Sequence, residues 1–321
     1  MKETRVCRLL GVDYPILQGG MLWLAAAPLA AAVSNAGGFG IISPFAGMAK
    51  DGNPAENLKQ EILKTRALTE KPFGVNIPLD LNDSGILIDL SIREHIDVVI
   101  TAAGSPEQYT AVLRASGITV LHVISSVKQA LLAGSSGVDA VIAEGSEAAG
   151  RLGFNELPQF SLVPQVAHSV KIPVIAAGGI ADGRGMAAAF ALGADGVQLG
   201  TRFVATEECI AHPRYKEAIL QAGDTDTIIT SRVFMSRRSL KTGFTRQLME
   251  LDRSGATAEE IRAFLGYRRA RAAQLDGDLD KGETYAGSSV GLISDTVPAA
   301  KVIERLINEY EETITELAKG K

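Results

Sequence analysis

Short apolar runs alternate with stretches of helical spacing eight times within about the first 200 residues of this 321-residue chain. The predicted strands are 15–17, 40–42, 73–76, 98–101, 120–123, 140–143, 174–177 and 197–199. Strands that alternate with helices pair in parallel, because each helix carries the chain back across the sheet. Eight such units favour a closed (β/α)8 TIM barrel. The alternative, an open doubly wound sheet, requires a reversal of strand order that a sequence does not reveal.

The pattern changes after the eighth predicted strand. Residues 212–281 are polar and rich in helical spacing, with no strand-like runs of comparable strength. Because this segment carries few large apolar side chains, it is a poor candidate for an independent domain. We predict a helical lid, residues 212–282, inserted over the mouth of a barrel built from residues 1–211 and 283–321. A final amphipathic helix, 297–318, is expected to close the barrel.

Composition excludes several classes of protein. The net charge is −5 and no long basic run offsets it, which argues against nucleic acid as the main partner. No apolar run approaches the ~18 residues of a membrane span, and residues 1–10 lack the apolar core of a signal peptide. The two cysteines are too few for a disulfide framework or a zinc cluster. We therefore expect a cytoplasmic protein.

A glycine turn follows each of the last two predicted strands. Gly178 and Gly179 end the seventh strand, and Gly200 and Thr201 end the eighth. Glycine lets backbone N–H groups approach an anion closely, and the threonine adds a hydroxyl donor. In a parallel barrel the loops after these two strands form the usual phosphate site. The pattern predicts a site that grips a phosphate group.

Three other positions are candidates for the mouth of the barrel. The run Gln18-Gly19-Gly20-Met21 follows the first strand, where a glycine pair lets backbone lie against a flat ring. Asn76 ends the third strand and His122 lies within the fifth. Each has a structural alternative. The glycine run would be an ordinary βα turn, Asn76 a turn amide and His122 a hydrogen-bonded interior histidine.

The loop after the sixth predicted strand contains Glu144, Glu147 and Arg151 among glycines. It would place two carboxylates and a guanidinium at the mouth. The alternative is a solvated ion pair between Glu147 and Arg151, four residues apart, worth ~0.3–0.5 kcal/mol. No Ser-His-Asp order and no metal-ligand spacing accompanies these residues.

Six segments together resemble the nitronate monooxygenase (2-nitropropane dioxygenase) superfamily, and more closely its enoyl-[acyl-carrier-protein] reductase II branch. They are YPILQGGM at 14–21, KPFGVNIP at 71–78, VIAEGSEAAG at 141–150, IPVIAAGGIADGRG at 172–185, QLGTRF at 198–203 and AHPRYKEAIL at 211–220. The resemblance runs through nearly the whole chain. It implies a TIM barrel that holds non-covalent FMN at its C-terminal mouth, and a homodimer.

The resemblance also implies positions for the cofactor. The residues matched to flavin-contacting positions are Gly20, Met21, Asn76, Glu144, Ala149, Gly178, Gly179, Gln198, Leu199, Gly200 and Thr201. Gly20 and Met21 would lie near the isoalloxazine ring. Gly178, Gly179, Gln198, Gly200 and Thr201 would hold the phosphate, in agreement with the glycine turns described above.

Arg151 departs from the pattern of the superfamily. Many relatives carry a proton-handling histidine there, after a glycine pair, whereas this chain reads Ala149-Gly150-Arg151. Arginine stays protonated and does not act as a base at neutral pH. It can stabilise a developing enolate or bind an anionic substrate instead. Base-assisted oxidation of a nitroalkane is therefore disfavoured, whereas an already anionic nitronate remains a candidate substrate.

The leading functional hypothesis is an FMN-dependent reductase that uses NADH or NADPH to reduce an enoyl thioester, either a small molecule or bound to an acyl carrier. Arg151 would stabilise negative charge on the thioester oxygen, and His122 or solvent would supply the proton. The alternatives are a nitronate monooxygenase that consumes O2, an NADH:quinone reductase and a non-enzymatic flavin-binding protein.

Overall fold

Residues 2–266 and 269–320 are described by a computed structural model, and within them eight parallel strands form one sheet. The strands are β1 (Ile16–Gln18), β2 (Gly40–Ile42), β3 (Phe73–Pro78), β4 (Val98–Ala102), β5 (Thr119–Ile124), β6 (Ala140–Glu144), β8 (Val174–Ala177) and β9 (Gly196–Leu199). Their order in the sheet is β1-β9-β8-β6-β5-β4-β3-β2. A parallel bridge between Leu17 and Phe39, directly before β2, joins the two edges. The predicted TIM barrel and its eight strands are confirmed.

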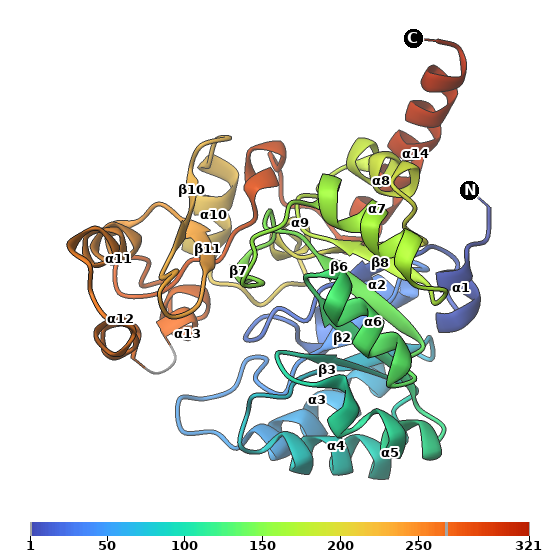
Figure 1. Cartoon of the computed structure of the whole chain (residues 1–321), viewed down its shortest axis with the longest axis horizontal. Helices are drawn as coiled ribbons and strands as arrows, with labels where there is room; N and C mark the ends of the chain where they lie inside the picture. The colour runs from blue at the N-terminus through green and yellow to red at the C-terminus, as the bar shows by residue number, and fades with distance from the viewer. Residues whose placement is uncertain (1, 267–268, 321) are drawn as a thin grey trace.

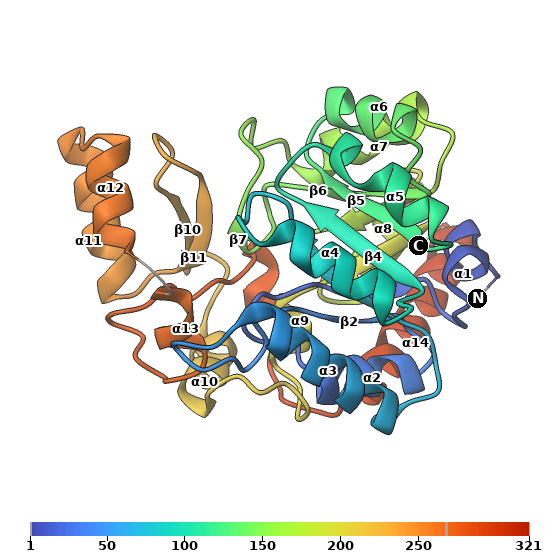
Figure 2. The ribbon, with the colours of Figure 1, turned by 90° about the horizontal axis from the view of Figure 1, so that it is seen from below.

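Helices surround the barrel (Figures 1 and 2). They are α2 (Ala27–Asn35), α3 (Pro54–Leu68), α4 (Ser84–Arg93), η1 (Pro106–Gln108), α5 (Thr110–Ala115), α6 (Val127–Ser135), α7 (Gln159–Ser169), α8 (Gly183–Ala191) and α14 (Ala299–Ala318). The N-terminal helix α1 (Arg5–Leu10) packs Val6 and Leu10 against the side chains inside the barrel. Because the interior is packed with apolar side chains and α1 packs against them, a ligand is expected at the carboxyl ends of the strands.

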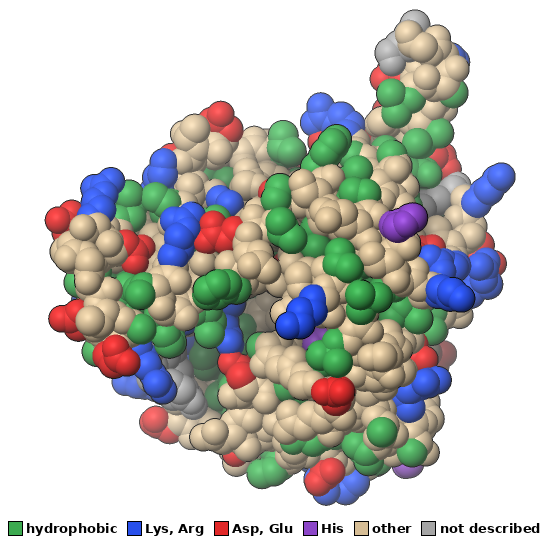
Figure 3. Space-filling view, viewed as in Figure 1, with side chains coloured by type: hydrophobic (Ala, Val, Ile, Leu, Met, Phe, Trp, Pro, Cys, Tyr) green, Lys and Arg blue, Asp and Glu red, His purple; other side chains and the backbone are tan. Residues whose placement is uncertain are grey.

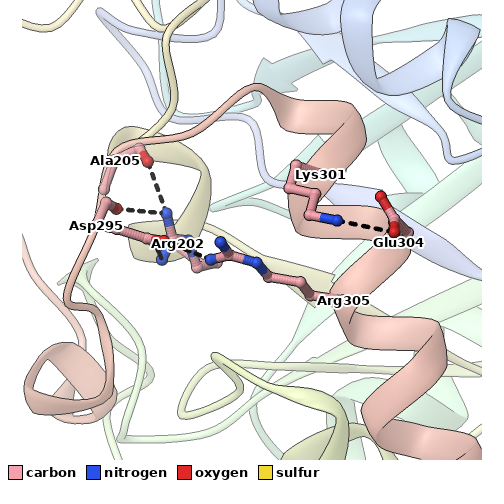
Figure 4. A network of polar contacts seen from close by, with 6 residues as sticks. All are labelled: Arg202, Ala205, Asp295, Lys301, Glu304 and Arg305. Atoms are coloured by element: carbon pink, nitrogen blue, oxygen red, sulfur yellow. Dashed lines mark hydrogen bonds and ion pairs between the residues drawn. The ribbon is translucent and has the colours of Figure 1, made fainter.

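A buried arginine connects the end of β9 to the C-terminal helix (Figure 4). Arg202 lies on the short helix α9 (Thr201–Val204) and donates to the backbone oxygens of Ala205 and Asp295, each at 2.7 Å. The Asp295 carboxylate also pairs with Arg202, at 3.1 Å, and with Arg305 of α14. This network holds the turn that begins at Thr201 against the segment leading into α14.

The segment predicted as a helical lid contains strands as well as helices, so the prediction that it lacks strand-like runs is wrong. Its elements are α10 (Pro213–Gln221), β10 (Thr227–Thr230), β11 (Arg237–Leu240), α11 (Gly243–Ser254), α12 (Ala258–Leu265) and α13 (Arg269–Gln274). Residues 267 and 268, between α12 and α13, lie outside the described part. β10 and β11 form an antiparallel hairpin, and β11 pairs with β7 (Gly150–Arg151) in the loop after β6.

The insertion has a small apolar cluster of its own. Phe244 and Leu248 of α11 pack against Ile261 and Leu265 of α12. The rings of Phe244 and Phe264 stack with centroids 5.1 Å apart. In residues 2–266 and 269–320, no helix combines the length and apolar character needed to cross a membrane.

Candidate active site

A cavity of about 500 Å³ lies at the carboxyl ends of the barrel strands, where the insertion meets the barrel. Figure 3 shows the hollow at this boundary. Eleven of the residues predicted from the sequence line it, namely Gly20, Met21, Asn76, Glu144, Ala149, Arg151, Gly178, Gly179, Gln198, Gly200 and Thr201. Two predicted residues, Leu199 and His122, lie outside its lining.

Leu199 acts on the site through its backbone. Its side chain is fully buried in the main core. Its carbonyl oxygen accepts a hydrogen bond from the N–H of Gly19 at 2.8 Å. This bond positions the glycine pair of the first loop.

The glycine turns at the predicted phosphate end have the conformation that an anion site requires. Gly178 and Gly179 adopt φ values of +100° and +73°, and a Cβ on Gly178 would lie 2.8 Å from the Cβ of Ala148. Among the described residues, no acceptor faces the backbone N–H groups of Gly178, Gly179 and Gly200. Thr201 Oγ accepts from the N–H of Gly287 at 3.0 Å, so its own hydrogen is available to a ligand. Together these groups offer donors that could hold a phosphate.

In another part of the cavity wall, the first loop brings its backbone close to an amide side chain at β3. A Cβ on Gly20 would lie 2.5 Å from the Cβ of Asn76, so only glycine fits there. The first loop and the end of β3 thereby form one wall. A flat ring can lie against this wall because no side chain stands out from Gly20.

Arg151 is held in place by the insertion. Its backbone pairs with Arg237 of β11, and the neighbouring Gly150 pairs with Arg238. The Arg238 guanidinium donates to the carbonyl oxygen of Ser146 at 2.9 Å. The hairpin of the insertion therefore fixes the loop after β6.

The ion pair between Glu147 and Arg151, offered as a structural alternative, does not form. The Glu147 carboxylate instead accepts from the N–H of Gln159, the first residue of α7, at 2.9 Å. Arg151 Nη2 lies 2.6 Å from Asp80 Oδ2, across the mouth of the barrel. Both side chains of this second pair are more than one-third exposed. An exposed pair is worth about 0–1 kcal/mol, so an anionic ligand can replace Asp80 as the partner of Arg151.

Glu144 is a cavity-lining carboxyl that titrates near neutral pH. Burial raises its pKa to about 7, and the positive charge of Arg151 opposes this rise in part. Glu144 stands at the end of β6 and can carry a proton at the cavity wall.

This shift predicts a pH-dependent stability. Because the pKa of Glu144 is raised on folding, the neutral carboxyl favours the folded state below about pH 4.5, and this benefit is lost as pH rises through about 7. The variant Glu144→Gln should therefore match the wild type in melting temperature near pH 4.5 and exceed it above pH 7. Thermal unfolding of both proteins across this range measures the difference. A constant difference at all pH values would contradict the shifted pKa.

His122 is an interior residue. Its Nδ1 lies 2.7 Å from Thr101 Oγ, and burial lowers its pKa to about 4. The ring is thus neutral at pH 7 and lies outside the cavity lining. Its role as a proton donor remains a prediction that no contact in the structure supports.

The sequence analysis missed a wall of the cavity that follows the insertion. Tyr285, Gly287 and Ser289 line the cavity, and the N–H of Ser288 donates to the carbonyl oxygen of Glu147 at 2.9 Å. Gly287 directly precedes the short helix η2 (Ser288–Leu292), and Ser288 and Ser289 belong to it. The run Gly287-Ser288-Ser289 was the available signal, since it offers backbone and hydroxyl donors beside the predicted phosphate site.

A buried ion pair supports this wall. The hydroxyl of Tyr285 donates to Glu283 at 2.8 Å, and Glu283 pairs with Arg237 at 2.9 Å. The hairpin strand β11 therefore contacts both the Arg151 loop and the Tyr285 segment.

Comparison with known proteins places the chain in a family. The sequence matches the family described as nitronate monooxygenase over residues 3–86 and 85–309. The chain belongs to the nitronate monooxygenase family. It is accordingly an oxidoreductase, and the recognition made from its motifs is confirmed.

Individual relatives within and around the nitronate monooxygenase family carry different names. The structure of FabK from Thermotoga maritima is 43% identical, with a TM-score of 0.93 and complete coverage of both chains. A (3aS,4S,5R,7aS)-5-hydroxy-7a-methyl-1-oxo-octahydro-1H-indene-4-carboxyl-CoA dehydrogenase of Rhodococcus jostii is 41% identical over 77% of this chain and 68% of its own. A probable nitronate monooxygenase of Staphylococcus aureus (strain Newman) is 31% identical over 97% of this chain and 98% of its own.

Proposed function

We propose that this chain is an FMN-dependent oxidoreductase that uses NADH or NADPH to reduce the double bond of an enoyl thioester. The observation that carries the proposal is the fixed positive charge of Arg151 in the cavity wall, at the position where the family resemblance implies a histidine. The name of the Rhodococcus relative, a CoA thioester dehydrogenase, supports a thioester substrate.

The residues present fit FMN. The N–H groups of Gly178, Gly179 and Gly200 and the hydroxyl of Thr201 would hold its phosphate, and the surface at Gly20 would accept its ring. When bound, FMN supplies hydride transfer between nicotinamide and substrate.

Arg151 supplies electrostatic stabilisation. Reduction at the β-carbon of an enoyl thioester leaves negative charge on the thioester oxygen, as an enolate. A guanidinium stays charged at all working pH values, and β11 holds the backbone of Arg151, so the side chain can stabilise that charge by exchanging Asp80 for the substrate oxygen. Asp80 keeps the guanidinium directed across the mouth until an anionic group replaces it.

Reduction of the double bond adds a proton as well as a hydride. Glu144 is the side chain best suited to supply that proton. Its carboxyl lines the cavity and its pKa is raised to about 7, so both protonation states are populated at neutral pH. Solvent remains the alternative source of the proton. His122 pairs with Thr101 and lies outside the cavity lining, so Glu144 is preferred to it in this proposal.

The donor is tested by following the visible flavin absorption of the purified holoprotein without oxygen. NADH, NADPH and an alkyl nitronate are added in separate cuvettes. Rapid bleaching by a nicotinamide alone is expected. Bleaching by the nitronate, with none by either nicotinamide, would overturn the proposal.

Nitronate oxidation is the second candidate. The family match favours it, and Arg151 suits an anionic nitronate as well as an enolate. Arg151 takes no proton from a substrate, so a neutral nitroalkane should be a poorer substrate than its nitronate. Oxygen consumption with a nitronate but not with its parent nitroalkane would support this alternative.

A further inference from the structure

Phe154 lies at the rim of the cavity with its side chain in solvent. The residue lines the cavity and is 93% exposed. The turn that carries it is anchored to the insertion, because the N–H of Leu152 donates to the carbonyl oxygen of Ser236 at 2.9 Å and Ser236 Oγ donates to Glu156 at 2.8 Å. The N–H of Glu156 also donates to the carbonyl oxygen of Gly153, at 3.2 Å. An anchored turn therefore presents an open aromatic face at the rim.

An amide donor belongs to the same part of the rim. Gln129 of α6 is exposed and also lines the cavity. Its Oε1 accepts from the backbone N–H of Ser125 at 2.7 Å and from Ser125 Oγ at 3.0 Å. A backbone N–H is always a donor, so these bonds fix which end of the amide is the oxygen. In the described part of the chain Nε2 has no acceptor, and it is available to a ligand.

The ring and the amide are brought together by contact between their loops. Gly153, directly before Phe154, lies against Ser125, and a Cβ on Gly153 would overlap the Ser125 side chain. Ser125 in turn holds the amide of Gln129. The loop after β6 and the loop after β5 thus place a flat apolar face and a fixed N–H donor at one edge of the cavity.

We propose that Phe154 and Gln129 bind the adenine base of a nucleotide ligand, with the base stacked on the Phe154 ring and Gln129 Nε2 donating to a ring nitrogen. Bases stack on aromatic side chains through their faces and accept hydrogen bonds at their edges. An acyl chain would cover the ring but offer no acceptor to Nε2. Lys128 is exposed directly before Gln129, and its positive charge favours the phosphates of such a ligand.

This assignment depends on the proposed function, whose nicotinamide donor and CoA thioester both carry adenine. The reacting group of either molecule must lie beside the flavin inside the cavity. Adenine is at the other end of each molecule, so it is expected at the rim. A simple alkyl nitronate has no base and would leave this part of the rim unused.

The test uses Phe154→Ala, Phe154→Trp and Gln129→Glu. The last variant keeps the oxygen that accepts from Ser125 and replaces the donating NH2 by a second oxygen. Phe160→Ala is the matched control, because Phe160 of α7 is 77% exposed but lies outside the cavity lining.

Binding to the oxidised holoproteins is measured by titration calorimetry with two pairs of probes. The first pair is the oxidised form of whichever nicotinamide coenzyme reduces the protein and nicotinamide mononucleotide, which lacks adenine. The second pair is crotonyl-CoA and crotonyl-4′-phosphopantetheine, which also lacks adenine. Both truncated probes keep a phosphate, so they report separately the effect of the charge that Gln129→Glu adds.

We expect Phe154→Ala to weaken binding of the adenine-containing probe in one or both pairs by about five- to thirtyfold, without effect on its truncated partner. Phe154→Trp and Phe160→Ala should bind as the wild type does, and Gln129→Glu should weaken the adenine-containing probe more than the truncated one. The pair that responds identifies which ligand carries the base. Unchanged affinities in Phe154→Ala, or equal losses for full and truncated probes, would overturn the adenine site and leave the proposed function intact. Failure of the wild type to bind any probe would overturn both.

Discussion

Replacing Arg151 by alanine should lower kcat/KM for enoyl-thioester reduction by about 10²–10³-fold. The guanidinium is the fixed positive charge that faces the cavity, and its loss removes stabilisation of the enolate oxygen. The backbone of residue 151 remains paired with β11, so the loop should keep its position. Steady-state kinetics, with flavin content measured in parallel, separates loss of catalysis from loss of cofactor.

Two further variants test whether the fall in kcat/KM is specific to the Arg151 side chain. Arg151→Lys keeps the charge but not the planar fork and should recover part of the rate. Arg232→Ala removes an arginine of the insertion that is paired with Glu156 and more than half exposed. It should retain wild-type kcat/KM. Wild-type turnover in Arg151→Ala would eliminate the assigned role.

Substituting Gly178 by alanine should weaken FMN binding by about 10-fold or more. The added Cβ would lie 2.8 Å from Ala148, at a φ of +100° that alanine rarely adopts. Relief of this clash moves the turn whose N–H groups are assigned to the phosphate. Each hydrogen bond to a charged group contributes about 1.5–3 kcal/mol, so losing one gives this effect. Flavin released on gel filtration and the dissociation constant from fluorescence titration measure it.

Gly117→Ala is the matched control for Gly178→Ala. Gly117 has a φ of +79°, and a Cβ there meets nothing within 4 Å. It precedes β5, at the end of the barrel opposite the mouth. The two variants should share a conformational penalty of about 1–2 kcal/mol, but Gly117→Ala should retain FMN. Equal flavin loss in both variants would refute the phosphate assignment to the turn at Gly178.

The barrel was predictable because its signals are local. Each strand is a short apolar run, and each helix between strands shows its own spacing and caps. Asp182, for example, accepts from the N–H of Gly185 at the start of α8, as its sequence position indicates. The cavity-lining glycines after β1, β8 and β9 were predictable for the same reason, since they directly follow strands.

The elements that were missed depend on contacts between distant segments. β11 reads Arg-Arg-Ser-Leu, which carries no strand pattern, and it forms because β10 and β7 pair with it on either side. Arg151 meets Asp80, 71 positions earlier in the chain, rather than the nearby Glu147.

The most direct test of the proposed function is the reaction of the reduced holoprotein with a thioester. The protein is reduced with dithionite in the absence of oxygen and mixed with crotonyl-CoA, and visible absorption and butyryl-CoA are followed together. The account predicts that flavin absorption returns at a rate that depends on crotonyl-CoA concentration, with butyryl-CoA formed in step. A protein that stays reduced with the thioester, yet turns over a nitronate with oxygen, would contradict the account and establish nitronate oxidation in its place.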